Sequence, residues 1–482
     1  MKKIQALLVC LFVFTWITGY STPALAASDN QTKSKKLVLG TSADYPPYEF
    51  HKKINGKDQI LGFDIEIAKE IAKDMGAELV IEDMKFDSLL LALNAGKVDM
   101  VMSAMNPTEE RRKNVDFSNI YYQSDQAVLI RAEDKDKYTT MDDLKGKHIG
   151  AQKSSIYEDM ARAVPNATVD ALAKISDLVL SLESKRIDAI VLELPVAESY
   201  EKNRSTLAVA EAKPESSEDG YAIAFRKGST DMVNQVNTTI DRLEKADMIN
   251  KYVADASKLA EAPSGTNIFT YFNQNKQYFL SGVGWTLLLS LVTVVFGLIL
   301  GIILVLMRLS KVKPLKWIAV AYIEFLRGTP LMVQLFIIYF GLPSIGIEFP
   351  KFLAGAIALS LNSAAYLAEI FRAGIQSIDK GQLEAARSLG MGHSMAMRFI
   401  ILPQALKQVL PAIGNEFVVI IKESSIVSLI GITDIMYQEE VVRGSTYAGL
   451  PPLLIAAVLY FILTFVCTKL LGIAERRLKT SD

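Results

Sequence analysis

The feature that most constrains the fold is an uncharged apolar run at residues 285–307, WTLLLSLVTVVFGLILGIILVLM. It is long enough for an α-helix to cross the hydrocarbon core of a bilayer. Residues 36–258 instead carry charged residues throughout. Four further apolar segments follow the first, at residues 317–342, 352–371, 406–432 and 452–473. The sequence therefore predicts a soluble N-terminal region and, over 281–482, an all-α transmembrane domain of about five helices.

Composition limits the classes of ligand and partner. The chain has 482 residues and a formal net charge of -1, so no basic excess indicates nucleic acid. Its two cysteines, Cys10 and Cys467, both lie in apolar segments, and its three histidines are far apart in the sequence. The soluble region therefore offers no disulfide and no thiolate metal site. We expect neither a metal nor a cofactor in this chain.

Residues 1–26 have the features of a secretory signal peptide. Lys2 and Lys3 precede an apolar core, and Ala24-Leu25-Ala26 fits a small-x-small cleavage site. An N-terminal anchor that is not cleaved is the alternative. We therefore expect residues 36–258 outside the cytoplasm.

Basic residues beside the apolar segments predict the topology. The first segment is followed by RLSKVKPLK at 308–316, and the last by ERRLK at 475–479. The loop after the third segment carries Arg372, Lys380, Arg387 and Arg398. The positive-inside rule places these three stretches and the C-terminus in the cytoplasm. Charged residues inside the segments either pair helices or line a transport path; these are Glu324, Arg327, Glu369, Glu416, Lys422 and Glu423.

One polar stretch, EAARSLGMGHSMAMRFIILP at 384–403, lies in the predicted cytoplasmic loop. Residues 382–389 favour a helix, and Gly390 and Gly392 mark a break. The stretch resembles the EAA loop of ABC-importer permeases. The residues of this chain at the matching positions are Glu384, Ala385, Ala386, Gly390, Ile400, Leu402 and Pro403. The stretches EFLRGTPLMVQLF and NEFVVIIKESS also resemble the polar-amino-acid branch of that family.

The resemblance implies a coupling role for this loop, at about 376–403. In the family, a short helix of the loop docks on a cytoplasmic ATPase, so the implied coupling residues are Glu384, Ala385, Ala386 and Gly390. The Gly-Lys pairs at 56–57, 96–97 and 146–147 all lack the Ser or Thr of a nucleotide-binding loop. We therefore expect the ATPase, with its ATP and Mg, to be a separate chain. The alternative to a coupling role is that residues 382–389 form an ordinary surface helix.

The soluble region alternates strand-like runs with amphipathic segments. LVLGTS and ELVIEDM favour strands, whereas GFDIEIAKEIAKDMG and FDSLLLALNAGK favour helices. This alternation predicts α/β layers with a mostly parallel sheet. A second set begins near HIGAQKSS, and GYAIAFRKGS returns to the first. We expect two lobes around a cleft, lobe 1 at about 36–127 and 222–258 and lobe 2 at about 128–221.

The region 29–260 resembles the extracytoplasmic amino-acid-binding proteins of ABC importers, which have a two-lobed, type II periplasmic-binding-protein-like fold. The matching stretches are GTSADYPPYEF, GFDIEIAKEIA, GKVDMVMSAMNPTEERRKNVDFS, GAQKSS and DAIVLELPVA. At matching positions the family binds its ligand, which implies ligand roles for Tyr45, Phe86, Ser103, Asn106, Arg111, Gln152, Ser155 and Glu193. Ser42 and Asp44 are further candidates for setting selectivity.

Each implied role has a chemical reason and an alternative. Arg111 suits the planar α-carboxylate as a bidentate donor, although a charged run is usually a solvated face. Glu193 would accept from the α-ammonium; Ser103 and Asn106 would bond main-chain groups of the ligand. Ser155 would donate to the carboxylate, and Gln152 would contact the ligand side chain. Tyr45 and Phe86 would form aromatic walls, or else a rigid turn and part of the core.

The ligand itself is less constrained. Some relatives have an Asp where this chain has Ser42, and a polar residue where it has Leu192. Fewer acids near the ligand side chain argue against a strict Lys or Arg binder. A neutral polar amino acid such as glutamine is therefore expected, while aromatic stacking leaves arginine and histidine open.

The whole chain is thus predicted to be a fused subunit of an amino-acid importer. A linker with a lead-in helix, at 261–280, would join the binding domain to the permease. Two copies would supply the two permease domains that the family needs, with the tethered binding domain outside the cell membrane. Such tethering suits a Gram-positive cell. A ligand-gated receptor or channel, or an enzyme on the same two-lobed fold, remains the alternative.

Overall fold

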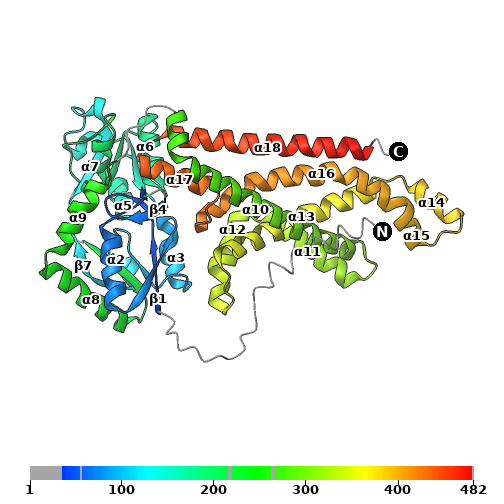
Figure 1. Ribbon diagram of the computed structural model, residues 1–482, viewed down its shortest axis with the longest axis horizontal. Helices are drawn as coiled ribbons and strands as arrows, with labels where there is room; N and C mark the ends of the chain where they lie inside the picture. Colours follow the sequence, from blue (N-terminus) through cyan, green and yellow to red (C-terminus); the bar gives the residue numbers. More distant parts are fainter. Residues whose placement is uncertain (1–34, 55–56, 215–219, 262–267, 480–482) are drawn as a thin grey trace. The chain divides into compact units, whose positions relative to one another are not determined.

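The computed structural model describes residues 35–54, 57–214, 220–261 and 268–479 (Figure 1). The predicted signal peptide, 1–26, and residues 262–267 of the predicted linker lie outside these residues. Residues from Lys36 onward form one compact unit. Among the described residues we distinguish the α/β region, 35–261, from the helical region, 268–479.

The first sheet of the α/β region contains strands from both ends of that region. Its order is β5 (Ala77–Asp83), β1 (Lys35–Thr41), β6 (Met100–Val101), β13 (Tyr221–Arg226) and β7 (Val115–Tyr122). Helix α2 (Phe63–Asp74) covers it, because Phe63, Ile67 and Ile71 form one buried stripe on that helix. The sheet, its helices and the small sheet β2–β3–β4 form lobe 1.

The second sheet has the order β10 (Thr168–Leu172), β9 (His148–Gln152), β11 (Ala189–Glu193), β8 (Gln126–Arg131) and β12 (Leu207–Val209). With its covering helices it forms lobe 2. The chain crosses between the sheets twice, from β7 to β8 and from β12 to β13.

The prediction of mostly parallel sheets is only partly right. Strands β1 and β6 are parallel, as are β9, β10 and β11. However, β13 runs antiparallel to β6 and β7, and β8 runs antiparallel to β11 and β12. Parallel neighbours require a crossover connection, usually a helix. The strands β13 and β8 each enter a sheet directly from the other lobe, so this requirement does not apply to them.

Shorter elements complete the α/β region. The small sheet contains β2 (Asp44–Tyr45), β3 (Glu49–Ile54) and β4 (Lys57–Leu61). The helices of lobe 1 are α3 (Leu89–Asn94), α4 (Glu109–Arg112), α8 (Thr230–Lys245) and α9 (Met248–Leu259). Those of lobe 2 are α5 (Ile156–Ala163), α6 (Ile175–Glu183) and α7 (Leu194–Asn203). Three single turns of 3-10 helix are η1 (Phe86–Ser88), η2 (Ala132–Asp134) and η3 (Met141–Leu144).

The helical region begins with α10 (Ile268–Leu309), α11 (Lys313–Gly328), α12 (Leu331–Phe336), η4 (Ile337–Gly341), η5 (Leu342–Ile345) and α13 (Lys351–Gln376). It continues with α14 (Lys380–Ser388), α15 (His393–Ala396), η6 (Met397–Ile401), α16 (Leu402–Glu423), η7 (Ser424–Ile430), α17 (Ile435–Thr446) and α18 (Leu450–Lys479). Helices α10, α13, α16 and α18 pack against one another, as Figure 1 shows.

Three helices among the described residues are long and apolar enough to cross a membrane: α10, α13 and residues 450–473 of α18. They contain the predicted spans at 285–307, 352–371 and 452–473. The predicted second span is instead a broken pair, α11 with Leu331–Ile345, bent by 108°. Helix α16 covers only residues 406–423 of the predicted fourth span, 406–432, and has Pro411 in its interior. A total of five spans therefore stays a prediction.

The first span is longer than the sequence suggested. Helix α10 has 42 residues, so at 1.5 Å per residue it is about 60 Å long, twice the hydrocarbon thickness of a bilayer. The predicted lead-in helix is therefore continuous with the first span. On α10, a Cβ added to Gly301 would lie 3.0 Å from Cβ of Leu367 on α13. Small residues let these two helices approach closely.

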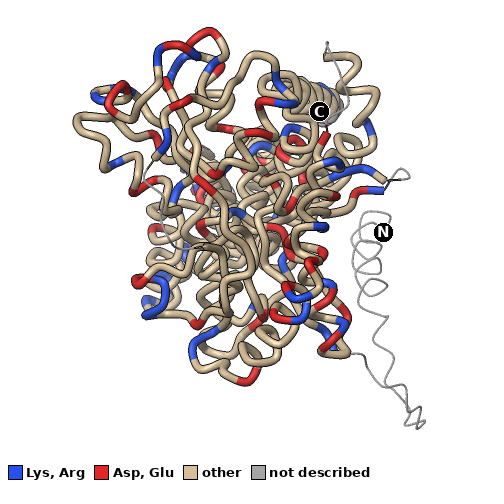
Figure 2. The backbone as a smooth tube through the Cα atoms, turned by 90° about the vertical axis from the view of Figure 1, so that its left-hand side faces the viewer, with Lys and Arg blue, Asp and Glu red and all other residues tan. Residues whose placement is uncertain are grey.

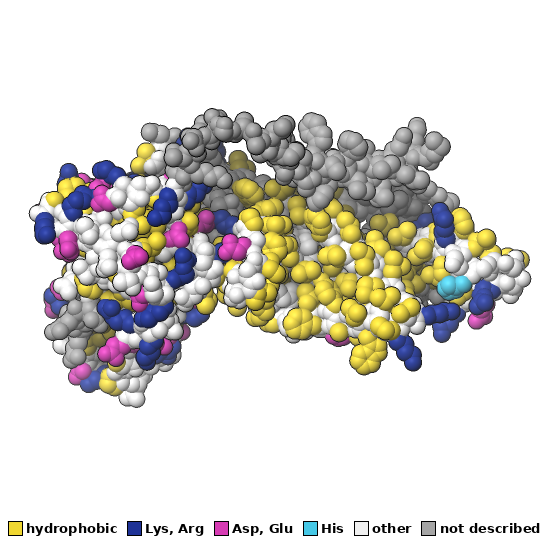
Figure 3. Space-filling model, turned by 90° about the horizontal axis from the view of Figure 1, so that it is seen from below, with side chains coloured by type: hydrophobic (Ala, Val, Ile, Leu, Met, Phe, Trp, Pro, Cys, Tyr) yellow, Lys and Arg dark blue, Asp and Glu magenta, His cyan; other side chains and the backbone are white. Residues whose placement is uncertain are grey.

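The two regions differ in how polar their exposed side chains are. Figure 2 shows Lys and Arg interspersed with Asp and Glu over the α/β region. Figure 3 shows hydrophobic side chains covering the helical region over much of its visible face. Ile299, Leu306, Trp317 and Phe465 are among the exposed apolar residues there. A continuous apolar surface of this kind is stable only against lipid or another protein.

One charged residue inside the predicted spans is paired. Glu369 accepts a hydrogen bond from Arg308 at 2.6 Å and also pairs with Arg372. Arg308 lies at the end of α10 and Glu369 lies in α13. For Glu369 the structure therefore shows helix pairing, one of the two roles that the sequence left open.

Candidate functional site

The predicted ligand residues follow strand ends in both lobes. Ser103 and Asn106 follow β6, whereas Gln152 and Glu193 are the last residues of β9 and β11. The carboxyl ends of parallel strands are where ligand-binding residues gather in α/β folds. Phe86 lies in η1 of lobe 1. The topology therefore brings residues that are far apart in sequence to the facing edges of two sheets.

Arg111 joins the two lobes. Its Nη1 donates to the carbonyl of Asn106 at 2.7 Å, and its Nη2 donates to the carbonyl of Ser154 at 2.7 Å. Its Cζ lies 5.6 Å from the centre of the Phe86 ring, within the range of a cation–π contact. Burial lowers the pKa of the Arg111 guanidinium to about 10, so it stays cationic at neutral pH. Arg111 is half-buried, whereas Arg112 beside it is exposed, so this part of the charged run is not simply a solvated face.

The residues from lobe 2 lie next to that contact. Ser155 is the N-cap of α5, and its Oγ donates to the carbonyl of Gln152 at 2.6 Å. Both side chains are buried. Lys153 lies between them in sequence and pairs with Asp87 of lobe 1 at 3.1 Å. The segment 152–155 thus faces lobe 1.

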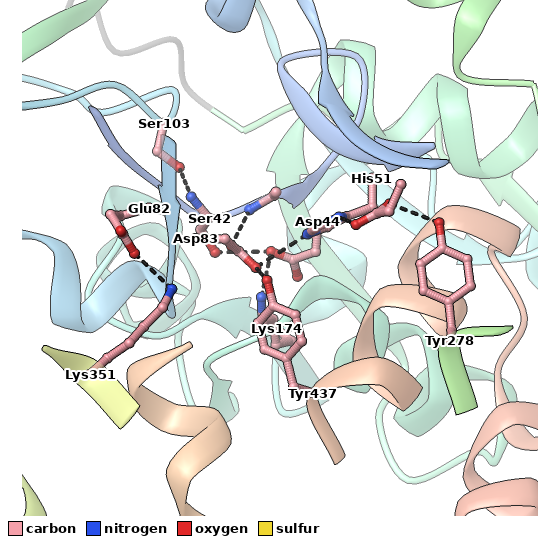
Figure 4. Close-up of polar contacts among 12 residues, drawn as sticks. Ser42, Asp44, His51, Glu82, Asp83, Ser103, Lys174, Tyr278, Lys351 and Tyr437 are labelled. Carbon is pink, nitrogen blue, oxygen red and sulfur yellow. Dashed lines mark hydrogen bonds and ion pairs between the residues drawn. The ribbon is translucent and has the colours of Figure 1, made fainter. Parts of the chain in front are cut away.

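The segment Ser42–Asp44 forms a second group (Figure 4). The backbone N–H of Ser42 donates to Oγ of Ser103 at 3.3 Å, and the Ser42 hydroxyl donates to Asp44 at 3.0 Å. The Asp44 carboxylate also pairs with Lys174 of lobe 2, at 3.4 Å. Both Asp44 and Lys174 are buried. The sequence reasoning missed Lys174, because a single Lys before α6 belongs to no recognisable pattern.

Two buried carboxyl groups, of Glu49 and Asp64, bond to Ser103 and to its neighbour Ala104. The Ser103 hydroxyl donates to Glu49. Asp64 accepts from the backbone N–H of Ala104 at 3.3 Å and from the Tyr121 hydroxyl at 2.9 Å. Burial raises the pKa of Asp64 to about 7, and burial with the neighbouring Asp64 raises that of Glu49 well above its usual range. Glu49 and Asp64 therefore hold protons at mildly acidic pH. The sequence reasoning did not single out either residue.

Glu193 is a buried carboxyl at the end of β11, with an exposed fraction of 1%. Burial raises its pKa well above the usual range, and within the described part of the chain its Oε2 has no hydrogen-bond partner. An ammonium group beside it would favour the charged carboxylate. This is the environment expected for a residue that receives the α-ammonium of a ligand.

The two predicted aromatic walls differ in their surroundings. Phe86 faces Arg111, as described above. Tyr45 is 3% exposed and packs against Tyr48, with ring centres 5.7 Å apart, in the main apolar core. The structure therefore joins Phe86 to the other predicted ligand residues, and it joins Tyr45 to the core of lobe 1.

The predicted coupling helix is α14. Asp379 caps its N-terminus by accepting from the backbone N–H of Gly381 at 2.6 Å. Gly390 follows its end with φ of 83°, a left-handed conformation that favours glycine. Within α14, Ala386 is buried, and Glu384 and Ala385 are exposed. The helix thus presents Glu384 on an open surface. Leu389, directly after the helix, is 83% exposed.

Comparison with known proteins decides the family. Residues 37–255 match the bacterial extracellular solute-binding proteins, family 3, and residues 267–480 match the binding-protein-dependent transport system inner membrane component. Over 206 residues the chain is 46% identical to the arginine transport system permease protein ArtQ of Bacillus subtilis (strain 168). That match covers 42% of this chain and 94% of ArtQ. The chain belongs to the amino-acid ABC importers.

This importer chain combines two components that are separate proteins among its relatives. The probable glutamine ABC transporter permease protein GlnM of Bacillus subtilis (strain 168) is 41% identical over 215 residues, which are 45% of this chain and 99% of GlnM. The arginine-binding extracellular protein ArtP of the same organism is 38% identical over 250 residues, which are 51% of this chain and 93% of ArtP. The prediction of a binding domain fused to a permease is confirmed.

Proposed function

We propose that this importer chain captures glutamine outside the cell and delivers it to its own permease for ATP-driven uptake. The observation that carries the proposal is the position of Arg111 between the lobes, with Phe86 beside it. A guanidinium placed there suits the α-carboxylate of an amino acid, because it donates two parallel hydrogen bonds. Buried Glu193 supplies the complementary acceptor for the α-ammonium.

Charge balance near the ligand side chain favours a neutral amino acid. Asp44 is a candidate partner for a cationic side chain, but Lys174 already pairs with it at 3.4 Å. Ser42 and Gln152 are uncharged. A guanidinium or ammonium would therefore lose its hydration without gaining an uncompensated carboxylate.

Arginine is the second candidate. The similarity to ArtP, named as an arginine-binding protein, favours it. The Phe86 ring also offers a face on which a planar guanidinium can stack. A bound arginine would therefore need an Asp44 carboxylate that is not paired with Lys174, whereas a bound glutamine would not.

We infer that a separate cytoplasmic ATPase, which holds ATP and Mg, supplies the energy for uptake. The exposed surface of α14, with Glu384 and Leu389, supports docking of such a partner. The EAA pattern of that helix is the reason for placing it on the cytoplasmic side, with the α/β region outside and the C-terminus inside. Two copies of the chain would complete the pore, and the apolar surface of the helical region is compatible with a second copy as well as with lipid.

The test is calorimetric titration of the full chain in lipid nanodiscs with each standard amino acid. We expect saturable binding, with a higher affinity for glutamine than for any other standard amino acid. The Arg111→Ala variant should show no binding. Tighter binding of arginine would select the second candidate. A chain that binds no amino acid would contradict the proposed function altogether.

A further inference from the structure

Helix α17 of the helical region contacts both lobes of the α/β region. Tyr437, near its start, bonds to Asp83 of lobe 1. Arg443, near its end, is buried and pairs with Asp177 of lobe 2. The ring of Tyr447, directly after α17, lies 5.0 Å from that of Tyr200 in lobe 2. The contacts of α17 therefore depend on how the two lobes are positioned relative to each other.

Asp83 is the residue at which two sets of contacts meet. Its Oδ1 accepts from the backbone N–H of Ala43 at 2.9 Å, and its Oδ2 accepts from the Tyr437 hydroxyl at 2.8 Å. Ala43 lies between Ser42 and Asp44, the two candidate selectivity residues. One carboxylate thus holds the backbone of the ligand site with one oxygen and a permease side chain with the other (Figure 4).

Imidazole contacts extend this arrangement to a second permease helix. Buried His51 lies 3.3 Å from Asp83 and 2.8 Å from Asp58 on β4. Asp58 accepts a hydrogen bond from the hydroxyl of Tyr278, on α10, at 2.8 Å. Although burial opposes the charged ring, hydrogen bonds to Asp58 and Asp83 raise the pKa of His51 to about 9. His51 is therefore a cation between two carboxylates that both receive a tyrosine hydroxyl.

A third helix makes an ion pair beside this group. Lys351, at the start of α13, pairs with Glu82 at 2.8 Å, one residue before Asp83. Strand β5 of lobe 1 therefore presents neighbouring carboxylates to α13 and α17. The complementary groups on these two helices are one ammonium and one phenol, which form directional contacts rather than a general apolar seal.

The ligand site and the permease thus share one short segment. Ser103, a predicted ligand residue, holds Ser42 on one side of this segment, and Lys174 of lobe 2 reaches Asp44 on the other. Displacement of Ser42–Asp44 by a ligand or by lobe movement would change the bond between Ala43 and Asp83. Since Asp83 is buried and bonded on both oxygens, it cannot follow Ala43 without disturbing Tyr437.

We propose that Asp83 is a coupling residue, through which occupation of the ligand site is transmitted to α17 of the permease by way of the Tyr437 hydroxyl. This inference rests on the proposed function. It makes a prediction specific to coupled sites: by reciprocity, a change in the permease that breaks the contact must also change ligand affinity. A contact that only tethers the domains would leave ligand affinity unchanged.

The test is titration of the full chain in lipid nanodiscs with glutamine and with arginine. Tyr437→Phe removes one hydroxyl and leaves every predicted ligand residue in place. We expect the dissociation constant of the bound amino acid to fall about threefold to tenfold, because the hydrogen bond that binding would disturb is already absent. Tyr252→Phe, on α9, is the matched control and should leave the constant unchanged. An unchanged constant in Tyr437→Phe overturns the proposal.

A second variant tests the route. Asp83→Asn keeps an acceptor for Ala43 but removes the charge. Combined with Tyr437→Phe, it should change the dissociation constant by less than the product of the two single effects, because both changes act on one contact. Multiplicative effects would show independent action and overturn the proposal.

The Arg111→Ala variant separates this inference from the proposed function. Loss of binding in Arg111→Ala, with no effect of Tyr437→Phe, overturns the coupling role of Asp83 alone. A wild-type chain that binds no standard amino acid overturns both.

Discussion

Arg111 and Ser154 are joined across the two lobes by a hydrogen bond of 2.7 Å, from the guanidinium Nη2 to the backbone carbonyl. Arg111 belongs to lobe 1 and Ser154 to lobe 2, so the contact exists only when the lobes face each other as they do here. A ligand carboxylate that binds Arg111 would either displace the Ser154 carbonyl from this nitrogen or share the nitrogen with that carbonyl. Ligand binding and lobe position are therefore linked at this one side chain.

Replacement of this side chain tests the carboxylate site directly. Arg111→Ala should weaken amino-acid binding to the full chain by at least about a hundredfold, because a half-buried charged partner of the ligand is removed. Calorimetry of the full chain measures the effect. Arg112→Ala is the control, since Arg112 is adjacent and exposed. Equal losses in both variants would show that general charge, rather than the position of Arg111, matters.

Selectivity is predicted to depend on Lys174. Lys174→Met removes the partner of Asp44 and leaves an uncompensated carboxylate near the ligand side chain. The affinity for arginine relative to glutamine should therefore rise about tenfold, which corresponds to about 1.4 kcal/mol of altered interaction. Competition between the two amino acids on the full chain gives the ratio. Lys147→Met, at an exposed position, should leave it unchanged. An unaltered ratio in Lys174→Met would remove Asp44 from the selectivity site.

The sequence was most informative where local pattern decides structure. The alternation of apolar runs predicts both sheets of the α/β class, and the spacing from Glu384 to Gly390 predicts helix α14 and its end. Arg111 was found because its neighbours form a family pattern. In each case the relevant information lies within about twenty residues of chain.

Contacts between distant segments could not be predicted in this way. Lys174 reaches Asp44 over 130 residues, and Tyr437 reaches Asp83 over 354 residues. Neither Lys174 nor Asp83 has a local environment that distinguishes it from an ordinary charged residue. Their roles depend on burial, which is a property of the folded chain.

The helical region shows the same limit. Hydropathy identifies apolar segments, but it does not show that Thr329 and Pro330 separate α11 from α12 at a bend of 108°. Nor does it show that α10 continues without a break from Ile268. Packing against neighbouring helices determines where such helices bend and how far they extend.

The coupling role of α14 predicts a variant that separates binding from ATP hydrolysis. Glu384→Lys reverses the charge of an exposed side chain that touches none of the ligand residues. Ligand affinity should stay unchanged, while ligand-stimulated ATP hydrolysis by the reconstituted complex should fall at least about threefold, because repulsion weakens docking of the ATPase. Glu348→Lys is the matched control, since Glu348 is exposed in the loop before α13. Unchanged stimulation in Glu384→Lys would contradict the docking role.

Stability of the α/β region is predicted to depend on pH through Asp64. Its folded pKa of about 7 lies above the ordinary value of 3.8 because of burial, so between these values the folded chain holds a proton that the unfolded chain has released. This contribution to stability is complete below about pH 4 and is lost as pH rises to about 7. Within that window the free energy of unfolding falls by up to about 1.4 kcal/mol for each pH unit.

Asp64→Asn removes the titrating group and keeps an oxygen that accepts from Ala104 and Tyr121. The difference in stability between wild type and Asp64→Asn should therefore change by several kcal/mol from pH 4 to pH 7, and should change little above pH 8. Urea titrations of the full chain measure this difference, with proteolytic cleavage within residues 35–261 as the signal for unfolding. Asp241→Asn, at an exposed position of α8, should show no such change. A constant difference for Asp64→Asn across this range would mean that Asp64 is ionised in the folded chain, and the raised pKa would be wrong.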